Sequence, residues 1–300
     1  LLNLYRQKGL NMQRGIGEVS WQRPWNTMGG QLYTPFASLR GDLYAVEHGR
    51  KLGHRDTQMQ LEKRHDRNGG ARFFPEIGMN WRWPFLNSLC GQSYVLSPVA
   101  QIVGSPSHSI GASNHKIPNE DSQAPEFNDA NLFSVDRFPG YDRIDRGSRA
   151  VYGGEVLMTG KLFGDISLFL GESYSFPRHQ PDRRIKGLNR QASDYVGRLD
   201  VNPYEWLSFN YRFRLDQKTF NWRIVEMGGT LGPEVAQLSG TYLFVSKHAG
   251  TPENNNISQA NFTFSSHFTK HWTFFAKMIK NFHKRTPAET RQGLDNHHGI

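Results

Sequence analysis

The chain has 300 residues, a formal net charge of +9 at pH 7 and only 37% hydrophobic residues. No apolar run approaches the roughly 18 residues of a membrane-spanning helix, which excludes a helical membrane protein. A membrane-spanning strand needs only about 9–11 residues with every second one apolar, so that class stays open. The single cysteine, Cys90, excludes a disulfide within this chain and a cysteine-based zinc site.

The two ends of the chain carry no strand pattern of their own. Residues 1–10 lack the basic start, apolar core and cleavage site of a secretory signal peptide. Residues 281–300 show no alternation and no terminal aromatic residue. We therefore expect one β-domain over residues 1–280 and an irregular tail over residues 281–300.

Period-two alternation dominates the chain and predicts an all-β, antiparallel, up-and-down fold. It is clearest at residues 206–216, where one face carries Leu207, Phe209, Tyr211, Phe213 and Leu215. The opposite, polar face carries Asn210, Arg212 and Arg214, which we expect to face a barrel lumen. Strands are expected at residues 17–25, 31–47, 71–81, 92–103, 147–159, 165–175, 193–201, 206–217, 221–230, 234–247, 258–266 and 272–280.

Short and long connections alternate along these strands. Links such as 161–164, 202–205 and 231–233 are short, whereas 49–70 and 104–146 are long and polar. A transmembrane barrel with short periplasmic turns and long external loops has this pattern. A soluble β-sandwich also alternates, but its strands are shorter, and its core is rich in aliphatic residues. We therefore favour about 12 strands of a larger transmembrane barrel.

The long segment 104–146 is expected to be ordered, because it holds several apolar residues: Phe127, Leu132, Phe133, Phe138 and Tyr141. We predict that it folds back onto the barrel mouth or into the lumen, with Arg137 and Arg143 paired to nearby carboxylates. Its acidic residues admit a divalent-cation site or a hydrolytic carboxylate pair. The favoured alternative is an ordered loop in which Asp and Asn cap turns and arginines neutralise the acids.

Two prolines lie inside predicted strands. Pro35 and Pro98 lack the N–H that a strand ladder uses, so each should mark a bulge, an edge or a weakened pairing. If these prolines have a function, they loosen a seam between two strands. The interpretation that we favour is a simple bulge without a functional role.

Four segments carry a resemblance to a known family. The most specific is IPNEDSQAPEFNDANLFSVDRFPGYDRIDRGSRAVYG at Ile117–Gly153. TPFASLRGD at Thr34–Asp42, PEIGMNWRWPF at Pro75–Phe85 and YVLSPVAQIVGSP at Tyr94–Pro106 come before it in the same order. Together, over roughly residues 16–280, they resemble the outer-membrane lipopolysaccharide-assembly family LptD (OstA, organic solvent tolerance protein), in an alphaproteobacterial-like form.

The resemblance implies a barrel in the cell outer membrane of Gram-negative bacteria that passes lipopolysaccharide to the outer leaflet. It implies as partners outer-membrane lipids, an LptE-like plug lipoprotein and an LptA-like periplasmic bridge, and no nucleic acid. The family's signal peptide and N-terminal jellyroll are not recognised here, so we interpret the chain as an internal piece of the barrel. Within the signature loop we expect these residues to matter: Asn119, Glu120, Asp121, Ser122, Phe133, Arg137, Phe138, Gly140, Asp142 and Arg143.

The resemblance implies no enzymatic activity, catalytic residue, metal or cofactor. The chain also has no nucleophile elbow and no dinucleotide fingerprint. Two other functions stay open from the residues alone. One is a passive outer-membrane porin or receptor channel, and the other is a soluble carbohydrate-binding β protein.

Overall fold

The computed structural model describes residues 2–4, 11–47, 70–89, 91–111, 117, 119, 121–122, 125–161, 164–176, 185–188, 190–233, 235–249, 256–269 and 272–282. Within these ranges the regular structure is sixteen β-strands and one 3₁₀ turn, η2 (Lys247–Ala249), with no α-helix. The described ranges accordingly contain no helix that is long and apolar enough to cross a membrane. The all-β prediction is confirmed.

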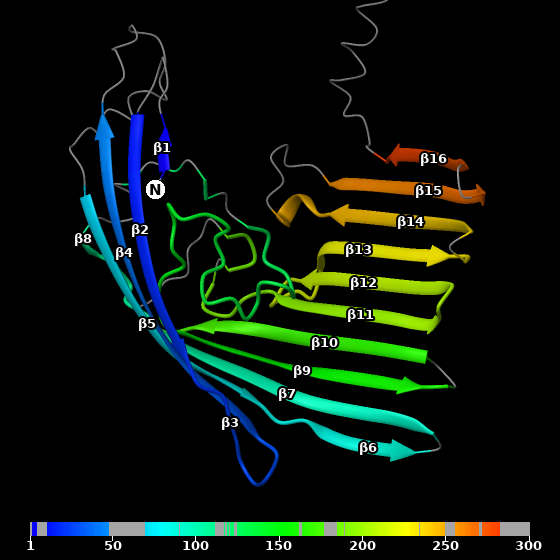
Figure 1. The fold of residues 1–300 in the computed structure, drawn as a ribbon, viewed down its shortest axis with the longest axis horizontal. Helices are drawn as coiled ribbons and strands as arrows, with labels where there is room; N and C mark the ends of the chain where they lie inside the picture. Colours follow the sequence, from blue (N-terminus) through cyan, green and yellow to red (C-terminus); the bar gives the residue numbers. More distant parts are fainter. Residues whose placement is uncertain are drawn as a thin grey trace, which may run out of the picture. The chain divides into compact units, whose positions relative to one another are not determined.

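The strands pair antiparallel with their neighbours in the chain, in the up-and-down order that the sequence predicts (Figure 1). The main path is β1-β2-β4-β5-β7-β9-β10-β11-β12-β13-β14-β15-β16, and β3, β6 and β8 pair with strands on that path. The bounds are β1 Leu2–Leu4, β2 Asn11–Gln22, β3 Trp25–Asn26, β4 Leu32–Glu47, β5 Gly70–Arg82, β6 Phe85–Leu89, β7 Gln92–Gly104, β8 Ile110–Gly111, β9 Arg149–Gly160, β10 Gly164–Ser175, β11 Tyr195–Tyr204, β12 Leu207–Leu215, β13 Trp222–Leu231, β14 Ala236–Val245, β15 Ile257–Thr269 and β16 Trp272–Asn281.

Each of the twelve expected strands has an observed counterpart, and the differences lie at the ends and in short pieces. β2 begins at Asn11 rather than at residue 17. Its first half carries Arg14 on the buried face, so apolar alternation does not reveal it. The strands that were not expected, β1, β3, β6 and β8, have two to five residues each, too few for a period to be read.

The chain divides into two compact units, which are described separately. Unit 1 comprises residues 1–87, 94–156 and 169–196, and unit 2 comprises residues 88–93, 157–168 and 197–300. Unit 1 contains the long loop between β8 and β9, whereas unit 2 contains the regular ladder from β11 to β16.

In unit 1 the β8–β9 loop packs against one face of the strands (green in Figure 1). Phe127, Leu132 and Phe138 of the loop are buried in one cluster with Val151 of β9 and Phe169 of β10. The rings of Phe133 and Phe169 meet edge to face, with centroids 6.1 Å apart. Burial of several large apolar side chains, each worth about 1.5–3 kcal/mol, therefore gives the loop a core that it shares with β9 and β10.

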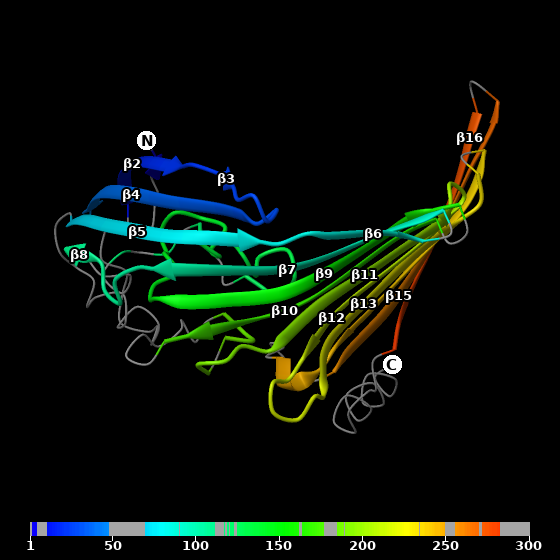
Figure 2. The same cartoon turned by 90° about the horizontal axis from the view of Figure 1, so that it is seen from below.

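In unit 2 the strands from β12 to β16 lie side by side in both ribbon views (Figures 1 and 2) and keep a regular register. Tyr211 is opposite Met227, which is opposite Tyr242, so apolar residues align across the ladder. Arg212 is opposite Glu226, which places charged residues together on the other face. One face of unit 2 is therefore apolar and the other polar.

The two strand prolines both lie opposite an interruption in a neighbouring strand. Pro35 of β4 lies beside the break between β2 and β3, and its carbonyl accepts a hydrogen bond from the Arg23 N–H. On the other side, Pro35 keeps a regular register with Met79 of β5. Pro98 of β7 lies beside the break between β5 and β6, and its carbonyl accepts from the Trp83 N–H. A role of either proline in a loosened seam stays a prediction.

Candidate functional site

The loop-covered face of unit 1 carries three buried arginines on three neighbouring strands. Arg14 of β2, Arg40 of β4 and Arg72 of β5 point to this face because side chains alternate along a strand. Their neighbours on the opposite face of β4, Leu39 and Leu43, are exposed. Buried arginines need partners, since an unpaired buried charge is very costly.

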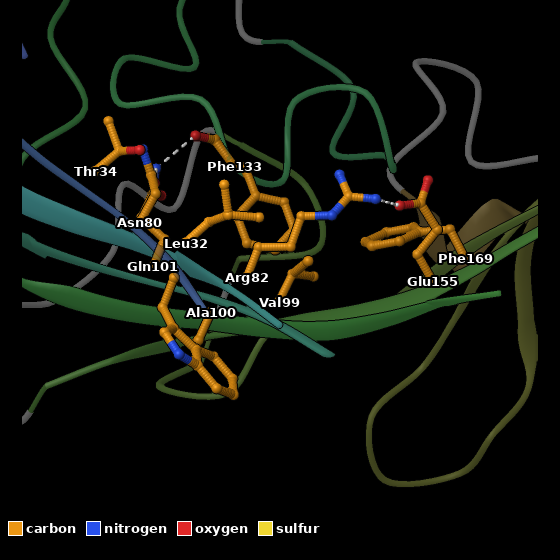
Figure 3. Close-up of a pocket in the computed structure, with 11 residues that line it drawn as sticks. Leu32, Thr34, Asn80, Arg82, Val99, Ala100, Gln101, Phe133, Glu155 and Phe169 are labelled. Atoms are coloured by element: carbon orange, nitrogen blue, oxygen red, sulfur yellow. Dashed lines mark hydrogen bonds and ion pairs between the residues drawn. The ribbon is translucent and has the colours of Figure 1, made fainter. Parts of the chain in front are cut away.

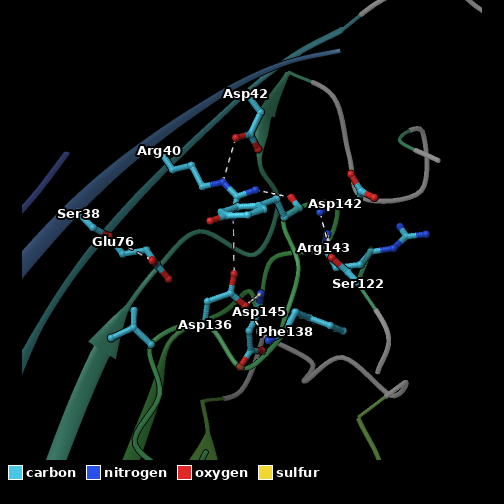
Figure 4. A network of polar contacts seen from close by, with 12 residues as sticks. Ser38, Arg40, Asp42, Glu76, Ser122, Asp136, Phe138, Asp142, Arg143 and Asp145 are labelled. Carbon is cyan, nitrogen blue, oxygen red and sulfur yellow. Dashed lines mark hydrogen bonds and ion pairs between the residues drawn. The ribbon is translucent and has the colours of Figure 1, made fainter. Parts of the chain in front are cut away.

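Asp42 of β4 pairs with two of these arginines. Its Oδ1 accepts a hydrogen bond from Arg40 Nε at 2.9 Å (Figure 4). Its Oδ2 accepts one from Arg72 Nε at 2.7 Å. Arg72 Nη2 also contacts Asp42 Oδ2 and donates to the Tyr44 hydroxyl at 2.8 Å. Three arginines and one aspartate leave the strands with a net positive group of hydrogen-bond donors that faces the loop.

The loop residues Tyr141 and Asp142 bind directly to these arginines. Asp142, which is completely buried, accepts a hydrogen bond at Oδ1 from Arg14 Nη1 at 2.5 Å. The Asp142 carbonyl accepts from Arg72 Nη1 at 2.9 Å, and the Tyr141 carbonyl accepts from Arg72 Nη2 at 2.8 Å and from Arg40. We call this set (Arg14, Arg40, Asp42, Arg72, Tyr141 and Asp142) the arginine clamp. It joins the loop to β2, β4 and β5 through charge-assisted bonds.

A second ionic group fixes the base of the loop. Arg137 Nη1 lies 3.1 Å from Asp145 Oδ2, and Arg149 Nη1 of β9 lies 3.6 Å from the same oxygen. Arg137 also donates to Ser173 Oγ of β10 at 3.1 Å and to the Leu132 carbonyl at 3.1 Å. The loop is therefore tied to β9 and β10 as well as to β2, β4 and β5.

A close crossing of two loop segments completes the arrangement. Ser122 Oγ accepts hydrogen bonds from the Asp142 N–H at 3.0 Å and the Arg143 N–H at 3.1 Å. Asp121 Oδ1 accepts from the Tyr141 N–H at 3.1 Å. Gly140 passes so near to Asp121 that a Cβ would lie 2.5 Å from both the Asp121 carbonyl oxygen and Oδ1. Only glycine fits this crossing without a shift.

We expect Gly140→Val to push the Asp121 segment away from the chain at Tyr141. The substitution should destabilise the folded loop by about 1–3 kcal/mol, the usual cost of overpacking, while leaving the strands intact. Limited proteolysis of the loop is the measurement. Gly154→Val is the control, because a Cβ at Gly154 meets nothing within 4 Å. Equal cleavage of the loop in both variants would contradict the role of Gly140.

Two loop carboxyl groups have shifted pKa values in opposite directions. Burial alone would raise the pKa of Asp121, but hydrogen bonds from the Asp142 N–H, Arg14 and Ser122 lower it to about 2. Burial raises the pKa of Asp136 to about 6, and the nearby charge of Asp145 adds to that rise. Asp136 Oδ1 accepts bonds from the Phe138 and Asp145 N–H groups, and Oδ2 lies 3.7 Å from Arg40 (Figure 4).

These shifts predict how loop stability depends on pH. The folded pKa of Asp121 is lowered, so its contribution is present above about pH 4 and is lost as the pH falls toward 2. The folded pKa of Asp136 is raised, so its contribution is present below about pH 4 and is lost as the pH rises through 6. We expect Asp136→Asn to be more stable than the wild type at pH 8, by up to about 3 kcal/mol. Thermal unfolding of both proteins at pH 4 and pH 8 tests this prediction. The same difference in stability between variant and wild type at both pH values would contradict it.

Two hollows that share lining residues lie beside the clamp in unit 1. The Arg82 hollow, about 490 Å³ in volume, is lined by Leu32, Thr34, Asn80, Trp81, Arg82, Val99, Ala100, Gln101, Phe133, Glu155 and Phe169 (Figure 3). The Glu76 hollow, about 710 Å³, is lined by Glu18, Ser20, Trp21, Gln22, Phe36, Ala37, Ser38, Glu76, Asn80, Gln101, Phe133, Val135 and Asp136. Asn80, Gln101 and Phe133 line both hollows. Arg82 pairs with Glu155 across the first one.

The loop acids serve as hydrogen-bond acceptors for arginines and backbone N–H groups. Asp121, Asp136, Asp142 and Asp145 each have such partners. The described residues contain no group of three or more His, Cys, Asp or Glu that is suited to a metal ion. In the described part of the loop, these acids join the loop to the strands through charge-assisted bonds.

A scan against protein-family models matches residues 1–272 to LptD, LPS transport system D. The chain belongs to the LptD family. A comparison with curated proteins gave no match. LptD-family membership assigns the chain to a family of lipopolysaccharide transport proteins, and it confirms the resemblance found in the sequence.

The LptD signature residues have different positions in the site. Asp121, Ser122, Gly140 and Asp142 meet at the loop crossing, whereas Arg137, Phe138 and Phe133 belong to the base of the loop and its apolar cluster. Asn119 bonds Ser122 through its amide, with its Nδ2 donating to the Ser122 carbonyl at 2.7 Å. Glu120 and Cys90 lie outside the described residues. Arg143 contributes its N–H to Ser122, and pairing of its guanidinium with a carboxylate stays a prediction.

The three polar residues of β12 lie on the polar face of unit 2. Asn210 and Arg212 are exposed there, and Arg214 is buried. The side chain of Asn210 lies over Gly228 of β13, where a Cβ would come within 2.4 Å of Asn210 Oδ1. Their contribution to a lumen stays a prediction.

Sequence reasoning missed the strand half of the clamp. Arg14, Arg40, Asp42 and Arg72 were not selected, although Arg40 and Asp42 are two apart in a predicted strand and hence share a face. A positive and a negative residue two apart on one face of a strand, with exposed leucines on the other face, indicate an ionic inner face. Their loop partners are about 100 residues away, and no local pattern reveals them.

Proposed function

We propose that this chain forms part of the wall of an outer-membrane β-barrel that delivers lipopolysaccharide to the outer leaflet. The observation that carries the proposal is the family match over residues 1–272. In this role the chain is a transporter subunit without enzymatic activity. It works with an LptE-like plug lipoprotein and an LptA-like periplasmic bridge, and its family makes lipopolysaccharide the transported molecule.

The two-faced ladder of unit 2 supports a membrane location. Its apolar face exposes large side chains that include Phe209, Met227, Leu238, Phe262 and Met278. A soluble protein rarely exposes so many apolar residues on one contiguous face, whereas a membrane barrel requires them. A soluble carbohydrate-binding protein therefore fits this face poorly.

The mechanism follows from the partition of a molecule with two chemically different ends. The saccharide of lipopolysaccharide remains hydrated along a polar face, whereas its acyl chains prefer hydrocarbon. Opening a seam between strands inside a membrane would cost backbone hydrogen bonds that lipid cannot replace, so such a seam needs weakened pairing. The ladder breaks beside Pro35 and Pro98 are candidates for that weakening.

The packing of the described part of the β8–β9 loop supports a transporter rather than a passive porin. A porin lumen is water-filled and permits diffusion of small solutes. Here the arginine clamp and the apolar cluster hold the loop against the wall of unit 1. We propose that this closure limits leakage when no lipopolysaccharide is in transit.

The test is depletion of the native gene product in its own host, with the full-length protein supplied from a second copy. Lipopolysaccharide at the cell surface is measured with a labelling reagent that cannot cross the outer membrane. We expect the labelled amount to fall on depletion and to recover with the wild-type copy. Normal surface lipopolysaccharide in depleted cells would contradict the proposed function.

A further inference from the structure

We infer that the Arg82 hollow and the Glu76 hollow of unit 1 bind an unphosphorylated stretch of the lipopolysaccharide glycan. The inference deepens the proposed transport function and rests on it for the source of the saccharide. Both volumes lie in the ~300–1,000 Å³ range of small-molecule sites. Asn80, Gln101 and Phe133 are shared by both, so one chain of sugar residues can contact these three side chains from either side.

The lining chemistry matches a sugar. Hydroxyl groups are both donors and acceptors, and the Glu76 hollow offers amide, hydroxyl and carboxylate side chains together with the rings of Phe36 and Phe133. An aromatic ring provides an apolar surface for the C–H groups of a sugar, and the polar groups fix its orientation.

Gln101 combines a place in the lining of both hollows with an acceptor oxygen that has no hydrogen-bond partner in the protein. The residue is only 3% exposed, and its Nε2 donates to Asn80 Oδ1 at 2.8 Å and to the Phe133 carbonyl at 2.9 Å (Figure 3). Its Oε1, however, is buried without a hydrogen-bond partner, as is Oε1 of Glu76. An unsatisfied buried acceptor is costly, and a hydroxyl donor in the hollow would satisfy it.

Charge excludes the phosphorylated part of the glycan from this position. Glu18, Glu76 and Asp136 line the Glu76 hollow, and none of its described lining residues is basic. Among the described residues that line the Arg82 hollow, Arg82 is the one basic residue, and it is already paired with Glu155. A phosphate would therefore meet acids in the Glu76 hollow and an already paired arginine in the Arg82 hollow, whereas a neutral sugar needs no cationic partner.

The first experiment uses the wild-type, full-length protein in complex with its partners in detergent. Calorimetry would compare three probes: delipidated core oligosaccharide, the same oligosaccharide after removal of its phosphates, and maltotriose. We expect the dephosphorylated oligosaccharide to bind at least about tenfold more tightly than either of the others. Tighter binding of the phosphorylated form, equal binding of maltotriose, or no binding of any probe would overturn the inference.

The second experiment locates the site with a matched pair of variants. Gln101 and Gln92 both belong to β7, are equally buried and have an unpartnered Oε1, but Gln92 lines neither hollow. Gln101→Leu should weaken binding of the dephosphorylated oligosaccharide at least about tenfold, and Gln92→Leu less than about twofold. Equal effects of the two substitutions on binding would overturn the assignment of the site. If a variant does not fold, binding of the three probes to the wild-type protein decides the inference.

The depletion test separates this inference from the proposed function. If the wild-type copy restores surface lipopolysaccharide but binds no oligosaccharide, only the saccharide site is wrong. If the wild-type protein binds the oligosaccharide but depletion leaves surface lipopolysaccharide normal, the transport function is wrong.

Discussion

Asp142→Ala is expected to release the β8–β9 loop and to make the outer membrane permeable to large antibiotics. Asp142 is completely buried, and it accepts bonds from Arg14 Nη1 and the Asp121 N–H. Removing one partner of a buried pair leaves an uncompensated charge, which typically costs about 3–5 kcal/mol. The loss should fall on the loop, because the strand ladders do not depend on Asp142. Sensitivity to a large antibiotic in cells, together with thermal unfolding of the purified protein, measures both effects.

The matched control is Glu126→Ala, which removes an exposed acid from the same loop and should leave both properties near those of the wild type. A double-mutant cycle with Arg14→Ala identifies the mechanism. If the buried pair is responsible, the double variant should lose less stability than the sum of the two single variants. Unchanged permeability in a stably assembled Asp142→Ala protein would contradict the closure role of the loop.

Tyr211→Arg is expected to destabilise the barrel far more than Asn210→Arg, although the two residues are adjacent. Tyr211 lies on the apolar face of β12, where its ring contacts those of Phe213 and Trp222 at centroid distances of 5.7 and 6.2 Å. An arginine on a lipid-facing position near the bilayer midplane costs about 2–4 kcal/mol, whereas a polar-face substitution costs little.

Denaturant titration of both variants, refolded into lipid vesicles, is the measurement. The result expected is a large loss of unfolding free energy for Tyr211→Arg and a loss near zero for Asn210→Arg. Equal losses, or the reverse order, would show that the apolar face of unit 2 does not contact lipid.

The strands were predictable because their signal is local. At β12, five apolar residues alternate with polar ones, and a period of two needs only adjacent residues. Packing of the loop was also predictable, because Phe127, Leu132 and Phe138 are too many apolar residues for a disordered tract. Both inferences depend on composition within a short window.

The clamp was not predictable because its partners are far apart in the sequence. Arg14 and Asp142 are separated by 128 residues, and each is individually a plausible surface charge. The same limit applies to the hollows, which form where β2, β4, β5 and β7 come together with the loop. For a related reason, the sequence does not reveal that β2 begins at Asn11. Arg14 interrupts the apolar alternation, and its burial depends on pairing with the distant Asp142.

Photo-crosslinking of lipopolysaccharide in living cells tests the transport role of the two-faced sheet most directly. A photoreactive residue at Arg212, on the polar face of β12, is compared with one at Phe209, which is 41% exposed on the apolar face of the same strand. We expect adducts to the saccharide of lipopolysaccharide at position 212 and none at position 209. Saccharide adducts only at position 209, or at neither position in cells that export lipopolysaccharide normally, would contradict the account.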